Sequence, residues 1–128
     1  MDNGQFMKEN VIKNKSFEFA LRVIKLYQFL TETRKEFILS KQLLRSGTSI
    51  GAMVRESEHA ENKADFVHKL SIALKEANET EYWVELLYKS DYIDEVLFNS
   101  ISTDINEILR LLISIIKSSK QKKLSIDN

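Results

Sequence analysis

Cysteine and proline are absent from this chain, and only three of its 128 residues are glycine. Without cysteine the protein can form neither disulfides nor thiolate metal sites, which suits a reducing cytoplasm. Because proline and glycine interrupt regular structure, their scarcity favours a few long helices over many short strands. No glycine-rich loop follows a strand, so the sequence contains no phosphate-binding fingerprint and implies no cofactor.

Long apolar runs are also missing. The most hydrophobic stretch covers residues 108–116, which is shorter than the roughly 20 residues that span a bilayer. The first ten residues lack the basic and apolar regions of a signal peptide. We therefore expect one cytoplasmic domain without membrane contact, and the 43% hydrophobic content suffices for a packed core.

Charge has no excess of either sign, since 19 basic residues balance 19 acidic ones. The distribution is nevertheless uneven: the net charge is +5 over residues 1–55, −9 over residues 56–107 and +4 over residues 108–128. Such polarity can steer self-association or bind a polyanion locally, although a dedicated nucleic-acid binder is more often basic throughout.

Apolar residues spaced three and four apart predict four helices, over residues 16–33, 37–60, 62–89 and 94–119. Candidate N-caps are Asn14 or Ser16, Asn62 with Asp65, and Asp94. Short connections predict an all-α, up-down-up-down antiparallel four-helix bundle. We assign residues 1–13 to an N-terminal extension, 14–119 to the bundle and 120–128 to a flexible basic tail. The expected core stripes are Ala20, Val23, Tyr27 and Leu30 in the first helix, Phe66, Leu70, Ala73, Ala77, Thr80, Val84 and Leu87 in the third, and Ile101, Ile105, Ile108, Leu112 and Ile115 in the fourth.

The second helix contains two of the three glycines, Gly47 and Gly51, within "QLLRSGTSIGAMVRESEHAE". Two glycines inside a helix lower its stability by about 2 kcal/mol relative to alanine. We therefore expect them to allow a close approach between backbones that compensates for this loss. Their i,i+4 spacing opens one groove. Two readings remain open: a tight contact inside one bundle, or a contact between copies of the chain.

A second apolar face favours contact between copies. Ile72, Trp83 and Leu86 form a series with Glu76 and Glu79 beside the core stripe of the third helix. Phe19 and Leu26 similarly lie beside the expected stripe of the first helix. A contiguous exposed apolar patch usually marks a contact, although Trp83 could also belong to the core. We therefore expect a homo-oligomer that packs through its second and third helices, in which Arg45 and Arg55 pair with glutamates of the third helix. The predicted interface comprises Arg45, Gly47, Gly51, Arg55, Ile72, Glu76, Glu79, Trp83 and Leu86.

The sequence contains only weak matches to catalytic or metal-binding motifs. Glu56 with His59 and Asp65 with His68 have the carboxylate-x-x-His spacing of di-iron bundles, but they flank a loop and two further helices supply no inward glutamates. The spacer between Arg55 and His59 is one residue short of an RNA-cleaving motif. The sequence therefore predicts no enzyme, no metal site and no catalytic residue.

Basic residues gather near both ends of the chain, and in an up-down bundle these ends meet. A solvated charged end is the plainer interpretation, and contact with RNA or DNA is the alternative. The candidate nucleic-acid contacts are Lys13, Lys15, Arg22, Lys25, Lys117, Lys120, Lys122 and Lys123.

Three blocks, "KSFEFALRVIKLY", "QLLRSGTSIGAMVRE" and "KADFVHKLSIALKEANETEYWVELL", resemble the bacterial proteins encoded in 23S rRNA intervening sequences. The resemblance covers about residues 10–118. It implies a four-helix bundle that forms a homopentamer and has no known enzymatic activity. The similar accessory protein of diversity-generating retroelements is a basic pentamer that binds nucleic acid, whereas this chain is neutral. We expect a non-catalytic homo-oligomer with candidate nucleic-acid contact; the alternative is a scaffold for other proteins without a nucleic-acid role.

Overall fold

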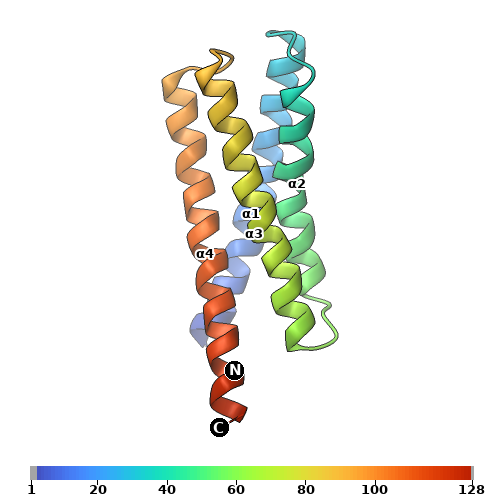
Figure 1. Cartoon of the computed structure of the whole chain (residues 1–128), viewed down its shortest axis with the longest axis vertical. Coiled ribbons are helices and arrows are strands. Elements are labelled where there is room, and N and C mark those ends of the chain that lie inside the picture. Colours follow the sequence, from blue (N-terminus) through green and yellow to red (C-terminus); the bar gives the residue numbers. More distant parts are fainter. Residues whose placement is uncertain (1–2, 128) are drawn as a thin grey trace.

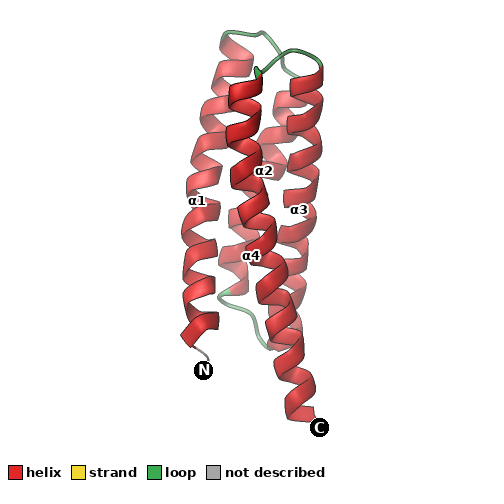
Figure 2. Cartoon of the chain, turned by 90° about the vertical axis from the view of Figure 1, so that its left-hand side faces the viewer, coloured by secondary structure: helices red, strands yellow, loops and turns green. Residues whose placement is uncertain are grey.

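Four antiparallel helices form the molecule in the computed structural model, which describes the backbone of residues 3–127 and the side chains of residues 4–121. Connections of five or six residues join the helices, so successive helices run in opposite directions (Figure 1). Both chain ends lie at the same end of the bundle (Figure 2). The predicted all-α, up-down-up-down bundle is therefore confirmed. The helices are α1 (Asn3–Glu32), α2 (Leu39–Ser57), α3 (Lys63–Lys89) and α4 (Glu95–Asp127).

The outer limits of the bundle differ from the sequence-based expectation. α1 begins at Asn3, so neither Asn14 nor Ser16 caps it. The earlier start brings Ile12 into the core, and the Lys8 ammonium donates to the Ser114 hydroxyl at 2.8 Å. At the other end, α4 continues past residue 119 to Asp127. The division into extension, bundle and tail, and the flexibility of residues 120–128, stay predictions.

Side-chain caps fix the start of the other three helices. Asn62 accepts from the Asp65 backbone N–H at 2.9 Å, and Asp94 accepts from Leu97 at 2.8 Å, as the sequence predicts. The α2 cap was not predicted. Glu36 is buried, and its carboxylate accepts from the first N–H groups of α2, those of Ile38, Leu39 and Ser40, at 2.7–3.0 Å. Burial acts to raise the pKa of Glu36, but these hydrogen bonds outweigh it and lower the pKa.

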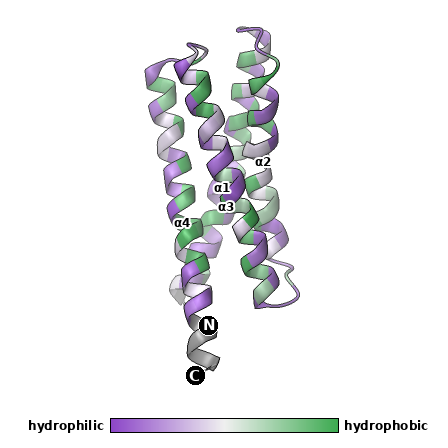
Figure 3. Ribbon diagram, viewed as in Figure 1, coloured by the Kyte–Doolittle hydropathy of each residue, from purple (hydrophilic) through white to green (hydrophobic). Residues whose placement is uncertain are grey.

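The core stripes of α3 and α4 lie where the periodicity places them, apart from Phe66, which is half-buried. In α1 the expectation is confirmed for Val23 and Leu30 and is wrong by one position for the other two residues. Phe19 and Leu26 are core residues of the single subunit, whereas Ala20 and Tyr27 are half-buried at its edge. α1 is apolar on several sides, so two adjacent stripes fit the spacing equally well. Figure 3 shows hydrophobic and hydrophilic residues alternating along all four helices.

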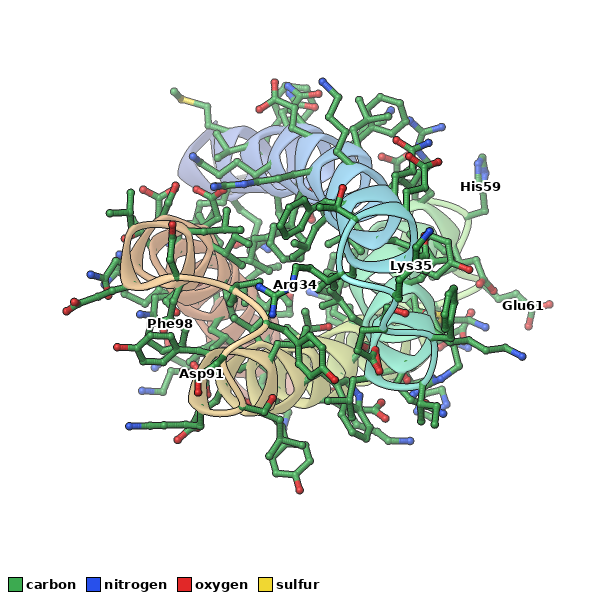
Figure 4. All side chains as sticks on the ribbon, turned by 90° about the horizontal axis from the view of Figure 1, so that it is seen from above. Arg34, Lys35, His59, Glu61, Asp91 and Phe98 are labelled. Atoms are coloured by element: carbon green, nitrogen blue, oxygen red, sulfur yellow. The ribbon has the colours of Figure 1, made fainter. Side chains whose placement is uncertain are left out.

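Polar links connect the helices of the bundle where apolar packing ends. At the end that carries two connections, the Arg34 guanidinium donates to the backbone oxygens of Asp91 and Tyr92 and lies 5.4 Å from the Tyr92 ring (Figure 4). Inside the bundle, the buried Thr80 hydroxyl donates to Ser46 at 2.9 Å, joining α3 to α2. Both links satisfy polar groups that would otherwise weaken the packed regions.

Candidate interaction surface

Of the two arginines expected to pair with glutamates of a second copy, Arg45 forms such pairs within one chain. Arg45 of α2 reaches across to α3, where its guanidinium lies 3.3 Å from the Glu76 carboxylate and also contacts Glu79. The hydrogen bond to Glu79 raises the pKa of Arg45, and the same bond lowers the pKa of Glu79. Glu76 is buried, so this cluster fastens α2 to α3 in the subunit itself. Both carboxylates therefore have a cationic partner without a second chain.

The two glycines serve a contact between α1 and α2 in the same chain. A Cβ at Gly47 would lie 2.8 Å from a methyl group of Val23, and Gly47 is buried. A Cβ at Gly51 would lie 3.2 Å from the backbone oxygen of Ser16. This supports the reading of a tight contact inside one bundle, and the assignment of the two glycines to an interface between copies stays a prediction. Only the tertiary structure reveals that the groove they open receives α1.

The remaining residues of the expected interface are divided between two faces. Ile72, Trp83 and Leu86 are half-buried, and Trp83 packs edge-on against Tyr82 with ring centroids 5.2 Å apart. Arg55 lies on another face, beside α1, where its guanidinium is 5.0 Å from the Phe17 ring. Arg55 therefore contacts no glutamate of α3 among the described residues. The nine predicted positions do not form one continuous exposed surface.

An apolar surface that the sequence analysis overlooked lies on α1. Of the twelve exposed large hydrophobic side chains among the described residues, seven belong to this helix: Phe6, Met7, Val11, Phe17, Leu21, Ile24 and Phe29. Phe17, Leu21 and Ile24 are 48%, 49% and 39% exposed and follow one another at helical spacing. The missed signal was the apolar content of residues 6–11, which we had placed outside the bundle.

Three basic residues proposed for nucleic-acid contact are instead paired with acidic residues of the same chain. Lys13 lies 3.3 Å from Glu58, Lys15 lies 2.7 Å from Glu107, and Arg22 lies 2.7 Å from Asp104, with a further bond to Ser100. The hydrogen bond to Glu107 raises the pKa of Lys15, and it lowers the pKa of Glu107. Most of the basic charge of α1 is therefore balanced locally.

The other basic candidates lie apart from these pairs. Lys25, Lys117 and Lys120 are exposed and form no ion pair among the described side chains. Lys25 sits in the second half of α1, away from the chain ends. Lys122 and Lys123 lie outside the residues whose side chains are described. The structure thus brings the predicted basic residues together only in part.

A cavity of about 440 Å³ occurs at the end of the bundle where the chain ends meet. Ile12, Val54, Leu70 and Ile115 form its floor, while Lys13 and Glu58 form an ion pair at its rim. These four residues are at most 2% exposed, whereas Phe6, Asn10 and Glu58, which also line the cavity, are exposed. The cavity therefore has an apolar base and a polar opening, but it contains no cluster of side chains that identifies a ligand.

Of the four residues with the carboxylate-x-x-His spacing, the two carboxylates take structural roles. Glu56 lies 3.4 Å from Lys69, and Asp65 accepts from the backbone at the start of α3. His59 is exposed and points away from the bundle (Figure 4). No group of three or more histidine or acidic residues that could hold a metal ion occurs in the described part of the chain.

These features define a class of protein. It is an all-α antiparallel four-helix bundle with a close α1–α2 contact and exposed hydrophobic side chains on its first helix. The family model described as 23S rRNA-intervening sequence protein matches residues 8–114, and the chain belongs to this family. No curated protein matches the chain. Over residues 3–127, none of the helices has the length and apolarity that a bilayer span requires.

A solved structure gives the same fold. It is a protein of unknown function from the S23 ribosomal protein family of Bacteroides thetaiotaomicron VPI-5482. The two chains are 61% identical and superpose with a TM-score of 0.85, over 86% of this chain and 98% of the other. The family and its fold are thus shown.

Proposed function

We propose that this protein is a non-catalytic, self-associating four-helix scaffold whose copies cover one another's α1. The observation that carries the proposal is the concentration of exposed hydrophobic side chains on this one helix. Neighbouring exposed hydrophobic side chains usually mark a contact surface, because water disfavours exposed hydrocarbon. The family resemblance implies five copies, which fits a surface that a single subunit leaves uncovered.

The expected gain from covering α1 is substantial. Burying a fully exposed leucine, isoleucine or phenylalanine side chain contributes about 1.5–3 kcal/mol. Phe17, Leu21 and Ile24 are 39–49% exposed, so covering each would contribute about 1 kcal/mol. Several such side chains in each copy would contribute together toward the net of about 8 kcal/mol that association at micromolar concentration requires.

Light scattering of the purified full chain over a range of concentrations tests the proposal. We expect a mass several times that of one chain. The variant Leu21→Glu/Ile24→Glu should have the mass of a single chain, because it places two carboxylates in the covered surface. Its circular dichroism should match that of the wild type, since neither residue belongs to the core.

A matched control adds the same charge elsewhere. Asn99→Glu/Thr103→Glu introduces two carboxylates about one helical turn apart, as the test variant does, on exposed positions of α4. It should leave the mass unchanged. A wild-type protein that remains a single chain at every concentration would contradict the proposal.

Nucleic-acid contact is a second proposal, supported by the exposed Lys117 and Lys120, which follow one another along the last turns of α4. Assembly would bring several such helix ends together and multiply the phosphate contacts. A mobility shift of RNA or DNA at 50 mM salt, weakened by Lys117→Glu/Lys120→Glu and lost at higher salt, is the expected result. Binding to another protein without nucleic acid, in the cytoplasm, is the remaining alternative, and the absence of any shift at low salt would favour it.

A further inference from the structure

We propose that the connection between α1 and α2 is a contact site for the surface of an anionic lipid bilayer. The site, here called the connection tip, consists of the exposed hydrophobic side chains of Phe37 and Ile38 and the basic side chains of Arg34, Lys35 and Lys41 near them in the chain. It lies at the end of the bundle opposite the chain ends (Figure 1). A single copy carries the whole site, so the inference goes beyond the proposed self-association and does not depend on it.

The two hydrophobic residues are adjacent in the chain and strongly exposed. Phe37 is 59% exposed and Ile38 is 77% exposed. Neither belongs to the exposed surface of α1, because both follow the end of that helix. Water disfavours exposed hydrocarbon, and neighbouring exposed hydrophobic side chains usually mark a contact. This end of the bundle therefore has a hydrophobic contact point of its own.

Hydrogen bonds hold the connection in its shape. The Glu36 N–H donates to the Leu30 carbonyl at 2.9 Å, and the Glu36 carboxylate accepts from the Ile38 N–H at 3.0 Å. Lys35 has a φ of 56°, so the chain has a lysine where the backbone conformation would favour glycine. A backbone fixed in this way loses little conformational entropy when its side chains bind a partner. The connection tip is therefore preorganised for contact.

The charges of the connection tip are positive and unpaired. Its three basic residues are exposed, and none of them forms an ion pair among the described side chains. Over residues 32–41 the one exposed acidic residue is Glu32, because Glu36 is buried as the cap of α2. Figure 4 shows Lys35 and Asp91 on different sides of this end, so the acidic α3–α4 connection lies apart from Lys35. The connection tip thus complements a negatively charged surface.

A bilayer surface fits this site better than a folded protein does. Stable protein–protein interfaces bury roughly 1,200–2,000 Å² in total, which two exposed side chains do not supply. Lipid headgroups need no matched surface, since hydrophobic side chains insert among them while basic side chains stay near the anionic phosphates. Nucleic acid would favour aromatic stacking, but Ile38, the more exposed of the two residues, is aliphatic. The chemistry of the site therefore points to anionic phospholipids.

Contact with a bilayer surface requires no membrane span. The expectation of no membrane contact rested on the absence of long apolar runs. A peripheral contact needs only a few exposed hydrophobic side chains beside basic ones. The exposure of Phe37 and Ile38 became visible only in the folded chain, because their positions in the sequence follow no amphipathic pattern.

Co-sedimentation of the purified full chain with lipid vesicles tests the proposal. At low salt we expect binding to vesicles of equal parts phosphatidylcholine and phosphatidylglycerol, and no binding to phosphatidylcholine alone. Phe37→Ser/Ile38→Ser and Lys35→Glu/Lys41→Glu should each lower the partition coefficient by more than about ten-fold. Circular dichroism of both variants should match that of the wild type, since all four positions are exposed.

Two further variants serve as matched controls. Lys117→Glu/Lys120→Glu changes the net charge by the same amount at the other end of the bundle. Val96→Ser removes a hydrophobic side chain that is 79% exposed but lies outside the connection tip. Both should bind the anionic vesicles as the wild type does. Losses in these controls as large as those in the connection-tip variants would overturn the proposal.

A tryptophan placed in the connection tip reports insertion directly. Trp83 is the only tryptophan of the chain. In Phe37→Trp/Trp83→Phe the only indole ring lies in the connection tip, and its emission should shift to shorter wavelengths when anionic vesicles are added, because the ring then leaves water. An emission that does not shift, or a wild type that binds no anionic vesicles, would also overturn the proposal.

Discussion

α1 and α2 pack closely against each other yet differ in how completely the bundle covers them. α2 is amphipathic: it buries one stripe, and among the described residues none of its large hydrophobic side chains is exposed. α1 buries an equally regular stripe but exposes seven further hydrophobic side chains. The bundle therefore covers the large hydrophobic side chains of α2 but leaves seven of those of α1 exposed. This difference separates the forces that fold one subunit from those that we propose assemble several.

The largest expected effect on stability comes from a substitution that disrupts the close contact between the two helices. Gly47→Leu should lower the free energy of unfolding by about 3 kcal/mol, since its first side-chain carbon would already meet Val23 at 2.8 Å. Urea denaturation measures the change. Adding Val23→Ala should recover part of the loss, whereas Ala52→Leu, at an exposed position of the same helix, should change stability little. Equal losses at positions 47 and 52 would contradict the packing role of Gly47.

Removing the carboxylate that starts α2 should have the next largest effect. Glu36→Gln should cost about 2 kcal/mol at pH 7, because the carboxylate caps three backbone N–H groups. The folded-state pKa of Glu36 lies below its ordinary value of 4.5. Its contribution is therefore complete above that value and is lost as the pH falls through the lowered pKa.

Urea denaturation between pH 7 and pH 3 measures this dependence. The stability difference between wild type and Glu36→Gln should shrink as the pH falls below about 4.5. Glu32→Gln, at an exposed position near the end of α1, serves as the control and should show no such trend. A difference that stays constant with pH would mean that Glu36 does not act as a charged cap.

A smaller effect should come from the connection between the two helices. Lys35 has a φ of 56°, in the left-handed region that glycine adopts most easily. Lys35→Gly should therefore raise the free energy of unfolding by up to about 1 kcal/mol, less the entropy that glycine adds to the unfolded chain. Thermal unfolding measures the gain. Arg34→Gly should instead destabilise, because it removes the bonds to Asp91 and Tyr92.

The smallest effect is expected where α1 meets α4. Lys15 and Glu107 are paired at 2.7 Å but remain largely solvated, at 43% and 39% side-chain exposure. Exposed pairs contribute little because water screens them. Lys15→Met and Glu107→Gln should leave the unfolding midpoint unchanged within error in 0.1 M salt. A marked loss in either variant would show that this seam depends on charge rather than on the core beneath it.

The spacing of apolar residues was sufficient to predict the buried residues where a helix has a single apolar face. The core of α4, from Ile101 to Ile115, and the caps at Asn62 and Asp94 follow directly from local spacing and local hydrogen bonding. It failed in α1, where Phe19 and Ala20 were equally acceptable core positions. The paired residues Arg22 and Asp104 were also beyond prediction, because 82 positions separate them in the chain. Pairing over such a separation depends on which helices become neighbours.

The amino-acid sequence by itself determined the four helices, their antiparallel order and most of the buried stripe in α3 and α4, because these follow from interactions within a few residues. Only the tertiary structure decided what Gly47 and Gly51 contact, which basic side chains form ion pairs and which helix keeps exposed hydrophobic side chains. Each of those outcomes depends on the neighbour that a face meets. A helix carries its pattern within its own sequence, but packing alone determines which part of that pattern is covered.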